Sequence, residues 1–270
     1  MNNERGKEFI TLFNRLAGRR SDWEVWNDFL TMSTYAFTNV MPTPEKEERE
    51  QRYLSIIRSY EKEEQEMFAQ LLCVVTMAFE DNPKQDFLGE IYIALGLNQH
   101  QKGQFFTPYH ICEFMAEIQL CEDFQEELEQ KGYISVSDPA CGAGAMLIAF
   151  ANVAKEHGLN YQKNVLFVAQ DIDATAAKMC YIQLSLLGCP ACVITGDSLL
   201  KSGLHPDNEV YYTPFYHLNA WRFNEKVTVE TTNTEVVEAC ITEPTVSAEA
   251  VRAYFNQSTG QFTFDFSKAS

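Results

Sequence analysis

The chain has 270 residues, of which 46% are hydrophobic and 22% are charged, a composition typical of a soluble globular protein with a substantial core. No apolar run reaches the ~18 residues that a membrane span needs, and the polar start Met1 to Arg5 lacks the apolar core of a signal peptide. We therefore expect a cytoplasmic protein without a membrane anchor. The formal net charge of −17 excludes a surface that is basic throughout, which is what a protein that holds DNA alone usually presents.

The first hundred residues show helical patterns. Phe9, Leu12, Phe13 and Leu16 fall on one helical face, and Gly18 ends that helix. Three further helices are expected here: one opened by a capping box of Ser21 with Glu24, one with Thr43 as N-cap and Pro44 at the first helical position, and one from Met67 to Phe79.

Two short segments follow before the first strand. Asp86 to Tyr92, of the pattern Asp-x-Leu-Gly-x-x-Tyr, predicts a short helix with an apolar face. In Gly103 to Pro108, Thr107 is placed to cap a helix that Pro108 starts and that runs to about Leu120. Read alone, this second segment is an ordinary helix N-terminus.

A glycine loop stands between the strand pattern at Tyr133 to Val136 and the helical pattern at Leu147 to Val153. Gly142 and Gly144 lack a Cβ, so their backbone can approach a ligand closely, and the next helix points free N–H groups at the same place. Asp138, at the carboxyl end of the strand, adds a fixed acceptor. Alone, the loop is equally consistent with a tight connection between strand and helix.

Acidic residues also end the next two predicted strands. Asn164 to Ala169 is a buried type of strand that leads into Asp171, and a carboxylate there can accept both ribose hydroxyls of a nucleoside. Asp173 is expected to cap the helix from Ala174 to Leu187, which Gly188 ends. The strand Ala191 to Thr195 leads into Gly196 to Leu199, which includes Asp197. Without other context, these acidic residues are a solvated strand end and a turn.

Cysteine usage adds little. Eight cysteines and no secretion signal favour free thiols over a disulfide framework. Cys189 and Cys192 have metal-ligand spacing, but a zinc ribbon needs a second pair, so a turn entering a buried strand is the favoured interpretation.

The segment from Asp138 to Gly144 closely resembles motif I of the S-adenosylmethionine-dependent DNA methyltransferases of the adenine-N6 class, commonly Asp-Pro-x-Cys-Gly-Ser-Gly, with Ala143 in place of the serine. The Asp86 to Tyr92 segment looks like the lead-in of modification subunits of type I restriction systems, and Gly103 to Pro108 resembles motif X of that family. The resemblance implies a Rossmann-like domain that binds S-adenosylmethionine. The residues implied as cofactor contacts are Phe106, Thr107, Pro108, Asp138, Ala140, Gly142, Gly144, Asp171, Ile172, Asp197 and Ser198.

The catalytic motif of the family is degenerate here. Adenine-N6 methyltransferases carry Asn/Asp/Ser-Pro-Pro-Tyr/Phe, whose polar side chain accepts from the target amine while the aromatic ring stacks on the flipped base. The nearest match is Thr213, Pro214, Phe215 and Tyr216, in which a hydroxyl replaces the amide or carboxylate. The alternative is an ordinary aromatic strand or loop.

The sequence therefore predicts an α/β protein with an N-terminal helical bundle over residues 1–100 and a Rossmann-like methyltransferase domain over residues 101–270. At the end of the chain, we expect strands at Lys226 to Thr231 and Gln261 to Phe266, and a helix at Ser247 to Phe255. The leading function is adenine-N6 DNA methylation of the restriction-modification type, weak or absent in the isolated chain. DNA would be held through a partner such as a specificity subunit, or through a local patch. The alternative is a catalytically dead module that binds the cofactor or a partner.

Overall fold

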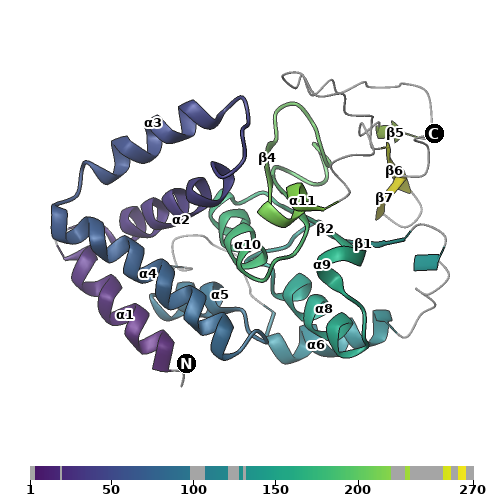
Figure 1. The fold of residues 1–270 in the computed structure, drawn as a ribbon, viewed down its shortest axis with the longest axis horizontal. Helices are drawn as coiled ribbons and strands as arrows, with labels where there is room; N and C mark the ends of the chain where they lie inside the picture. The colour runs from purple at the N-terminus through teal and green to yellow at the C-terminus, as the bar shows by residue number, and fades with distance from the viewer. Residues whose placement is uncertain are drawn as a thin grey trace.

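The computed structural model describes residues 4–18, 20–97, 107–120, 128–129 and 132–219, and the backbone of three short strands nearer the C-terminus. The N-terminal part is helical (Figure 1). Its helices are α1 (Glu4–Ala17), α2 (Asp22–Thr38), α3 (Lys46–Ile57), α4 (Lys62–Asp81) and α5 (Phe87–Ala94).

Helices and strands then alternate. The elements are α6 (Tyr109–Leu120), β1 (Ile134–Asp138), α8 (Ala145–Glu156), α9 (Tyr161–Asn164), β2 (Val165–Asp171), α10 (Ala174–Leu186), β3 (Ala191–Thr195), β4 (Glu209–Tyr212) and α11 (Pro214–Leu218). A separate sheet contains β5 (Val229–Thr231), β6 (Arg252–Asn256) and β7 (Gln261–Asp265). This architecture confirms the predicted α/β class with a helical N-terminal region.

The four-stranded sheet has the order β1-β2-β3-β4. β1, β2 and β3 are parallel, with Asp138 opposite Ala169 and Asp171 opposite Thr195. β4 runs antiparallel to β3, with Cys192 opposite Tyr212. The carboxyl ends of β1, β2 and β3 therefore share one edge, whereas the end of β4 lies at the opposite edge of the sheet.

One apolar core joins the helical region to the sheet. Phe9 of α1 is fully buried, and its ring contacts Trp26 of α2 and Phe87 of α5 at centroid distances of 6.1 Å. The same cluster of buried side chains continues through α8 and α10 to the strands. The division near residue 100 remains a prediction: residues 98–106 lie outside the described part, and the core extends across that position.

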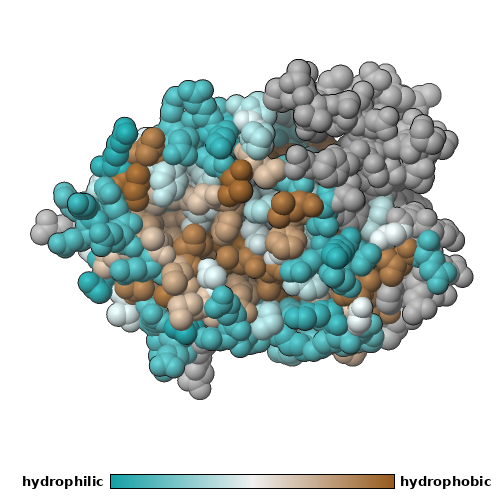
Figure 2. All heavy atoms as spheres, in the orientation of Figure 1, coloured by the Kyte–Doolittle hydropathy of each residue, from teal (hydrophilic) through white to brown (hydrophobic). Residues whose placement is uncertain are grey.

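The surface reflects this arrangement. On the face shown in Figure 2, hydrophobic residues gather over the middle of the view, where α2, α4 and α10 lie in Figure 1, and hydrophilic residues surround them. Within the described ranges, no helix is long and apolar enough to cross a membrane.

One predicted capping box does not form, and one predicted helix start was wrong. Ser21 is the N-cap of α2, but its side chain makes no capping hydrogen bond, and α3 begins at Lys46 after Glu45 rather than after Thr43. The Thr43 hydroxyl instead accepts from Arg49, 3.0 Å away. A capping box does exist at α4, where Glu61 and Glu64 satisfy each other's backbone N–H groups, because a carboxylate can fill the capping role of a serine.

The predicted helix at Ser247 to Phe255 was also wrong over residues 252–255, the part of it that the structure describes. Residues 252–256 form β6, which pairs with β7 so that Tyr254 lies opposite Thr263. The pattern Ala-Tyr-Phe favours a strand once a partner strand can satisfy its backbone. β5 and β7 confirm strands within the segments predicted at Lys226 to Thr231 and Gln261 to Phe266.

Candidate cofactor site

Hydrogen bonds within the glycine loop and to the ends of β1 and β2 hold this loop, which connects β1 to α8. Gly142 has φ of +55° and Gly144 has φ of +96°, the left-handed region that glycine adopts without strain. Cys141 N donates to the Gln170 carbonyl at 3.0 Å, and Gly144 N donates to the Cys141 carbonyl at 2.8 Å. The Asp138 carboxylate accepts from Ala140 N at 3.1 Å. The loop is thus folded against the ends of β1 and β2.

Gly144 is required for packing as well. A Cβ at this position would lie 2.8 Å from Sγ of Cys180 on α10, which is closer than a Cβ atom normally comes to another side-chain atom. Gly144 is also the N-cap of α8, and its carbonyl accepts from Ile148 N. The absence of a side chain here brings α10 against the loop and directs the first N–H groups of α8 toward the same edge.

Asp171 holds the glycine loop from β2. One carboxylate oxygen, Oδ2, accepts from Gly142 N at 2.8 Å, and the other, Oδ1, accepts from Asp173 N at 2.9 Å. Asp173 caps α10 as predicted, because its side chain accepts from Thr175 N. Ile172, between the two acids, is 71% exposed. An exposed apolar side chain beside an acidic strand end is suited to a flat aromatic ligand.

The turn after β3 presents Asp197 and Ser198. Asp197 Oδ1 accepts from the backbone N–H groups of Leu199 and Leu200, at 2.9 Å and 3.1 Å. Gly196 N donates to the Asp171 carbonyl at 2.9 Å, so this turn begins directly beside the end of β2. Asp138, Asp171 and Asp197 therefore come together on one edge, as the parallel strands require.

Sequence reasoning missed Gln170, which anchors this turn. Its side chain donates to the carbonyls of Gly196 and Lys201, at 3.3 Å and 3.0 Å, and accepts from Gly203 N at 3.0 Å. Gln170 is only 4% exposed. A polar residue at the end of an otherwise apolar strand was the signal that could have identified it, since buried amides need partners.

The electrostatic character of the edge is acidic. Burial raises the pKa of Asp138 above its usual value, the hydrogen bond from Ala140 N opposes that rise, and the nearby charge of Asp171 adds to it. The Asp171 carboxylate contacts the loop directly, Asp173 N donates to that carboxylate, and the turn that contains Asp197 begins beside the Asp171 carbonyl. Such an edge favours a ligand that carries positive charge.

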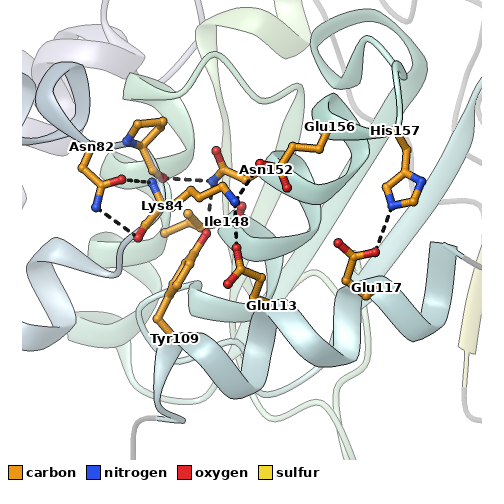
Figure 3. A network of polar contacts seen from close by, with 10 residues as sticks. Asn82, Lys84, Tyr109, Glu113, Glu117, Ile148, Asn152, Glu156 and His157 are labelled. Carbon is orange, nitrogen blue, oxygen red and sulfur yellow. Dashed lines mark hydrogen bonds and ion pairs between the residues drawn. The ribbon is translucent and has the colours of Figure 1, made fainter.

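The helix after the predicted motif X is fixed to α8. Lys84 Nζ bridges Glu113 of α6 and Glu156 of α8, at 2.9 Å and 2.7 Å, and Asn152 donates to the Tyr109 hydroxyl at 3.2 Å (Figure 3). These contacts orient the start of α6 relative to the helix that follows the glycine loop.

Of the predicted motif X contacts, Thr107 and Pro108 are described, whereas Phe106 lies outside the described residues. Helix α6 begins at Tyr109, and the Pro108 carbonyl accepts from Ile111 N and Cys112 N. Pro108 thus precedes the helix rather than starting it, which corrects the prediction by one residue. Burial raises the pKa of Cys112, in the first turn of α6, to about 11, and the charges of Asp86 and Asp138 add to the rise.

The structure does not bring the predicted catalytic segment to this edge. Thr213 follows β4, and Thr213 N donates to the Ala191 carbonyl at the amino end of β3. β3 spans five residues, so at ~3.3 Å per residue this position is at least roughly 13 Å from the turn containing Asp197.

The Thr213 side chain is also occupied. It is fully buried, its hydroxyl donates to the Cys189 carbonyl at 2.6 Å, and it accepts from Ala191 N at 2.9 Å. Pro214, Phe215 and Tyr216 belong to α11, which Thr213 caps. The alternative interpretation, an ordinary structural segment, fits these contacts, and the role of amine acceptor does not. The favoured interpretation of Cys189 and Cys192, a turn entering a buried strand, fits their positions, because Cys189 precedes β3, Cys192 lies within it, and both are buried.

The sequence of this chain is similar to that of a known protein family. The family model described as N-6 DNA Methylase matches residues 83–249. A crystal structure assigned as a class I S-adenosylmethionine-dependent methyltransferase from Listeria monocytogenes is 17% identical, with a TM-score of 0.38. That match covers 73% of this chain and 55% of the other, so this chain spans little more than half of it. The curated proteins gave no match. Because the family model spans more than half of the sequence, including the glycine loop and all three acidic strand ends, the chain belongs to the N-6 DNA methylase family.

Proposed function

We propose that this chain binds S-adenosylmethionine, the cofactor of its family, at the carboxyl edge of β1, β2 and β3. The observation that carries the proposal is the convergence of a positive-φ glycine loop with the acidic ends of three neighbouring parallel strands. The proposed contacts are Thr107, Pro108, Asp138, Ala140, Gly142, Gly144, Asp171, Ile172, Asp197 and Ser198, with Phe106 added from the sequence.

The residues present fit this cofactor. Each oxygen of Asp171 accepts one backbone N–H, and a carboxylate oxygen has a second lone pair for a ribose hydroxyl. Ile172 offers an exposed apolar surface to the adenine ring. The acidic surroundings of the loop suit the positive sulfonium and ammonium groups. When bound, S-adenosylmethionine supplies an electrophilic methyl group, and the role of these residues is to hold and orient it.

We infer further that the methyl acceptor is the N6 amine of adenine in DNA and that the system is of the restriction-modification type. The family match supports adenine, and the resemblance of residues 86–92 and 103–108 to modification subunits supports the type. Because Thr213 lies at the opposite edge, the group that accepts from the amine must come from elsewhere. With a net charge of −17, the chain needs a partner such as a specificity subunit, or a local basic patch, to hold DNA.

A second candidate is a module that binds the cofactor without transferring its methyl group. The burial and full hydrogen bonding of Thr213 favour it. Both candidates share cofactor binding and differ in chemistry.

Two measurements on the purified chain test these alternatives. Calorimetry with S-adenosylhomocysteine should show saturable binding, and no binding would overturn the proposal. A transfer assay with labelled S-adenosylmethionine on mixed DNA, with and without cell extract from the source organism, then separates the enzyme from the silent module. Transfer under either condition supports the methyltransferase, and binding without transfer supports the second candidate.

A further inference from the structure

The Asp-x-Leu-Gly-x-x-Tyr segment has contacts that explain its pattern. Asp86 is the N-cap of α5, and its Oδ1 accepts from Gly89 N at 3.0 Å. A Cβ on Gly89 would lie 2.1 Å from Asp86 Oδ2, so only glycine leaves room for the carboxylate. Asp86 is 5% exposed, although ionisable groups are rarely buried without a specific partner.

That partner is Gln183 on α10, whose side chain is fully buried. Its Nε2 donates to Asp86 Oδ1 at 2.8 Å and to the Ala143 carbonyl at 2.7 Å. Its Oε1 accepts from Leu88 N at 2.9 Å. One amide therefore ties the start of α5 to the middle of the glycine loop.

The bond to Ala143 anchors the peptide between Ala143 and Gly144 to a side chain outside the loop. Ala143 stands between Gly142 and Gly144, both with positive φ, and glycine restricts neighbouring peptide planes least. In a trans peptide the C=O and the next N–H point in opposite directions. Holding the Ala143 carbonyl toward Gln183 thus turns Gly144 N the other way, where it donates to the Cys141 carbonyl.

We propose that Asp86 and Gln183 are positioning residues that preset the glycine loop for the cofactor. The inference rests on the proposed binding of S-adenosylmethionine and extends that site to α5. The family match, which begins at residue 83, includes Asp86. The helix before the predicted domain division thus serves the cofactor site, and the loop does not have to be ordered by the ligand, which would cost affinity.

The test compares cofactor affinity in matched variants. Gln183→Met removes the amide at similar volume, and calorimetry with S-adenosylhomocysteine should show about tenfold weaker binding, the equivalent of roughly one lost hydrogen bond. Gln85→Met is the control: Gln85 is also buried, and it donates to the Ala78 and Asn82 carbonyls at the end of α4. It should leave affinity within about twofold of the wild type, because those carbonyls lie outside the loop.

Asp86→Asn is the conservative variant, which should retain the hydrogen bonds that Asp86→Ala removes. An asparagine oxygen in the place of Oδ1 keeps both acceptor bonds, so affinity should stay within about threefold, whereas Asp86→Ala should lose about tenfold. Equal affinity in the wild type and Gln183→Met would overturn the inference while leaving the proposed function intact.

A measurement on the protein without ligand tests whether Gln183 holds the loop, even if the wild-type chain does not bind the cofactor. Amide hydrogen exchange of Gly144 should accelerate at least about tenfold in Gln183→Met and not in Gln85→Met, because only the first variant frees the Ala143 peptide. Unchanged exchange in both would overturn the inference. If the wild-type chain fails to bind the cofactor, the proposed function falls, and this exchange measurement still decides whether the pair holds the loop.

Discussion

The carboxylate of Asp171 accepts a 2.8 Å hydrogen bond from Gly142 N, so the end of β2 directly holds the loop that follows β1. The same carboxylate also accepts from Asp173 N, which leaves its outer lone pairs as the proposed acceptors of the ribose hydroxyls. One side chain thus supports the loop and is also the proposed acceptor for the ribose of the ligand.

Asp171→Ala should weaken binding of S-adenosylhomocysteine by roughly tenfold or more, because charge-assisted hydrogen bonds are lost on both sides. Calorimetry measures this directly. Asp173→Asn is the control, since asparagine preserves the cap of α10 while removing a neighbouring charge. An equal loss in both variants would show that charge alone, and not the placement of Asp171, sets the affinity.

Thr213→Val should lower the free energy of unfolding by about 1–3 kcal/mol, because the Cys189 carbonyl and Ala191 N would lose a buried partner. Cofactor affinity should not change, since the residue lies at the opposite edge. Urea denaturation and calorimetry check the two parts, with Thr11→Val on the exposed face of α1 as a control expected within about 0.5 kcal/mol. Loss of methyl transfer without loss of stability would restore a catalytic role to Thr213.

Gly144→Ala should destabilise the fold more than Gly158→Ala. Both glycines have positive φ, +96° and +80°, so both substitutions carry the backbone cost, but only a Cβ on Gly144 meets Cys180 Sγ, at 2.8 Å. The overpacking should add about 1–3 kcal/mol to the difference in unfolding free energy. Equal destabilisation would mean that α10 yields to the added methyl group.

Asp86→Asn should make stability less sensitive to pH. Burial raises the pKa of Asp86 to about 6 from an ordinary value of 3.8. The folded state therefore keeps its proton longer than the unfolded state, and this group lowers stability as pH rises from about 4 to about 6. Asparagine removes that effect, so the stability of the variant relative to the wild type should increase by up to about 3 kcal/mol between pH 4 and pH 7.

Urea denaturation of the wild type and Asp86→Asn at a series of pH values measures this effect. A difference that is independent of pH would contradict the raised pKa. Glu66→Gln in α4 is a suitable control, because it removes an exposed charge, whereas the charge of Glu90 in α5 itself contributes to the raised pKa of Asp86.

The isolated chain should bind duplex DNA poorly, because a net charge of −17 repels phosphates. A gel-shift titration at low salt measures this. Binding that is tight and insensitive to salt would show a DNA-binding surface that the overall charge conceals.

Local patterns in the sequence were sufficient to locate most residues of the candidate site. The loop with Gly142 and Gly144, the acids Asp138, Asp171 and Asp197, and the cap at Asp173 could all be located from the chain alone. Strand, loop and helix signals are local, and parallel strands place their carboxyl ends together, so the convergence of the acids followed from the order of the elements.

Only the tertiary structure decided where Thr213 and Gln183 lie relative to the candidate site. Thr213 follows a strand, as a catalytic motif would, but β4 pairs antiparallel with β3 and so delivers it to the far edge. Gln183 sits in an apolar helix with no motif of its own, and only packing brings it to Asp86 and Ala143, which are 97 and 40 residues away. Strand direction and contacts between distant residues depend on how the whole core packs, and no local pattern of side chains encodes them.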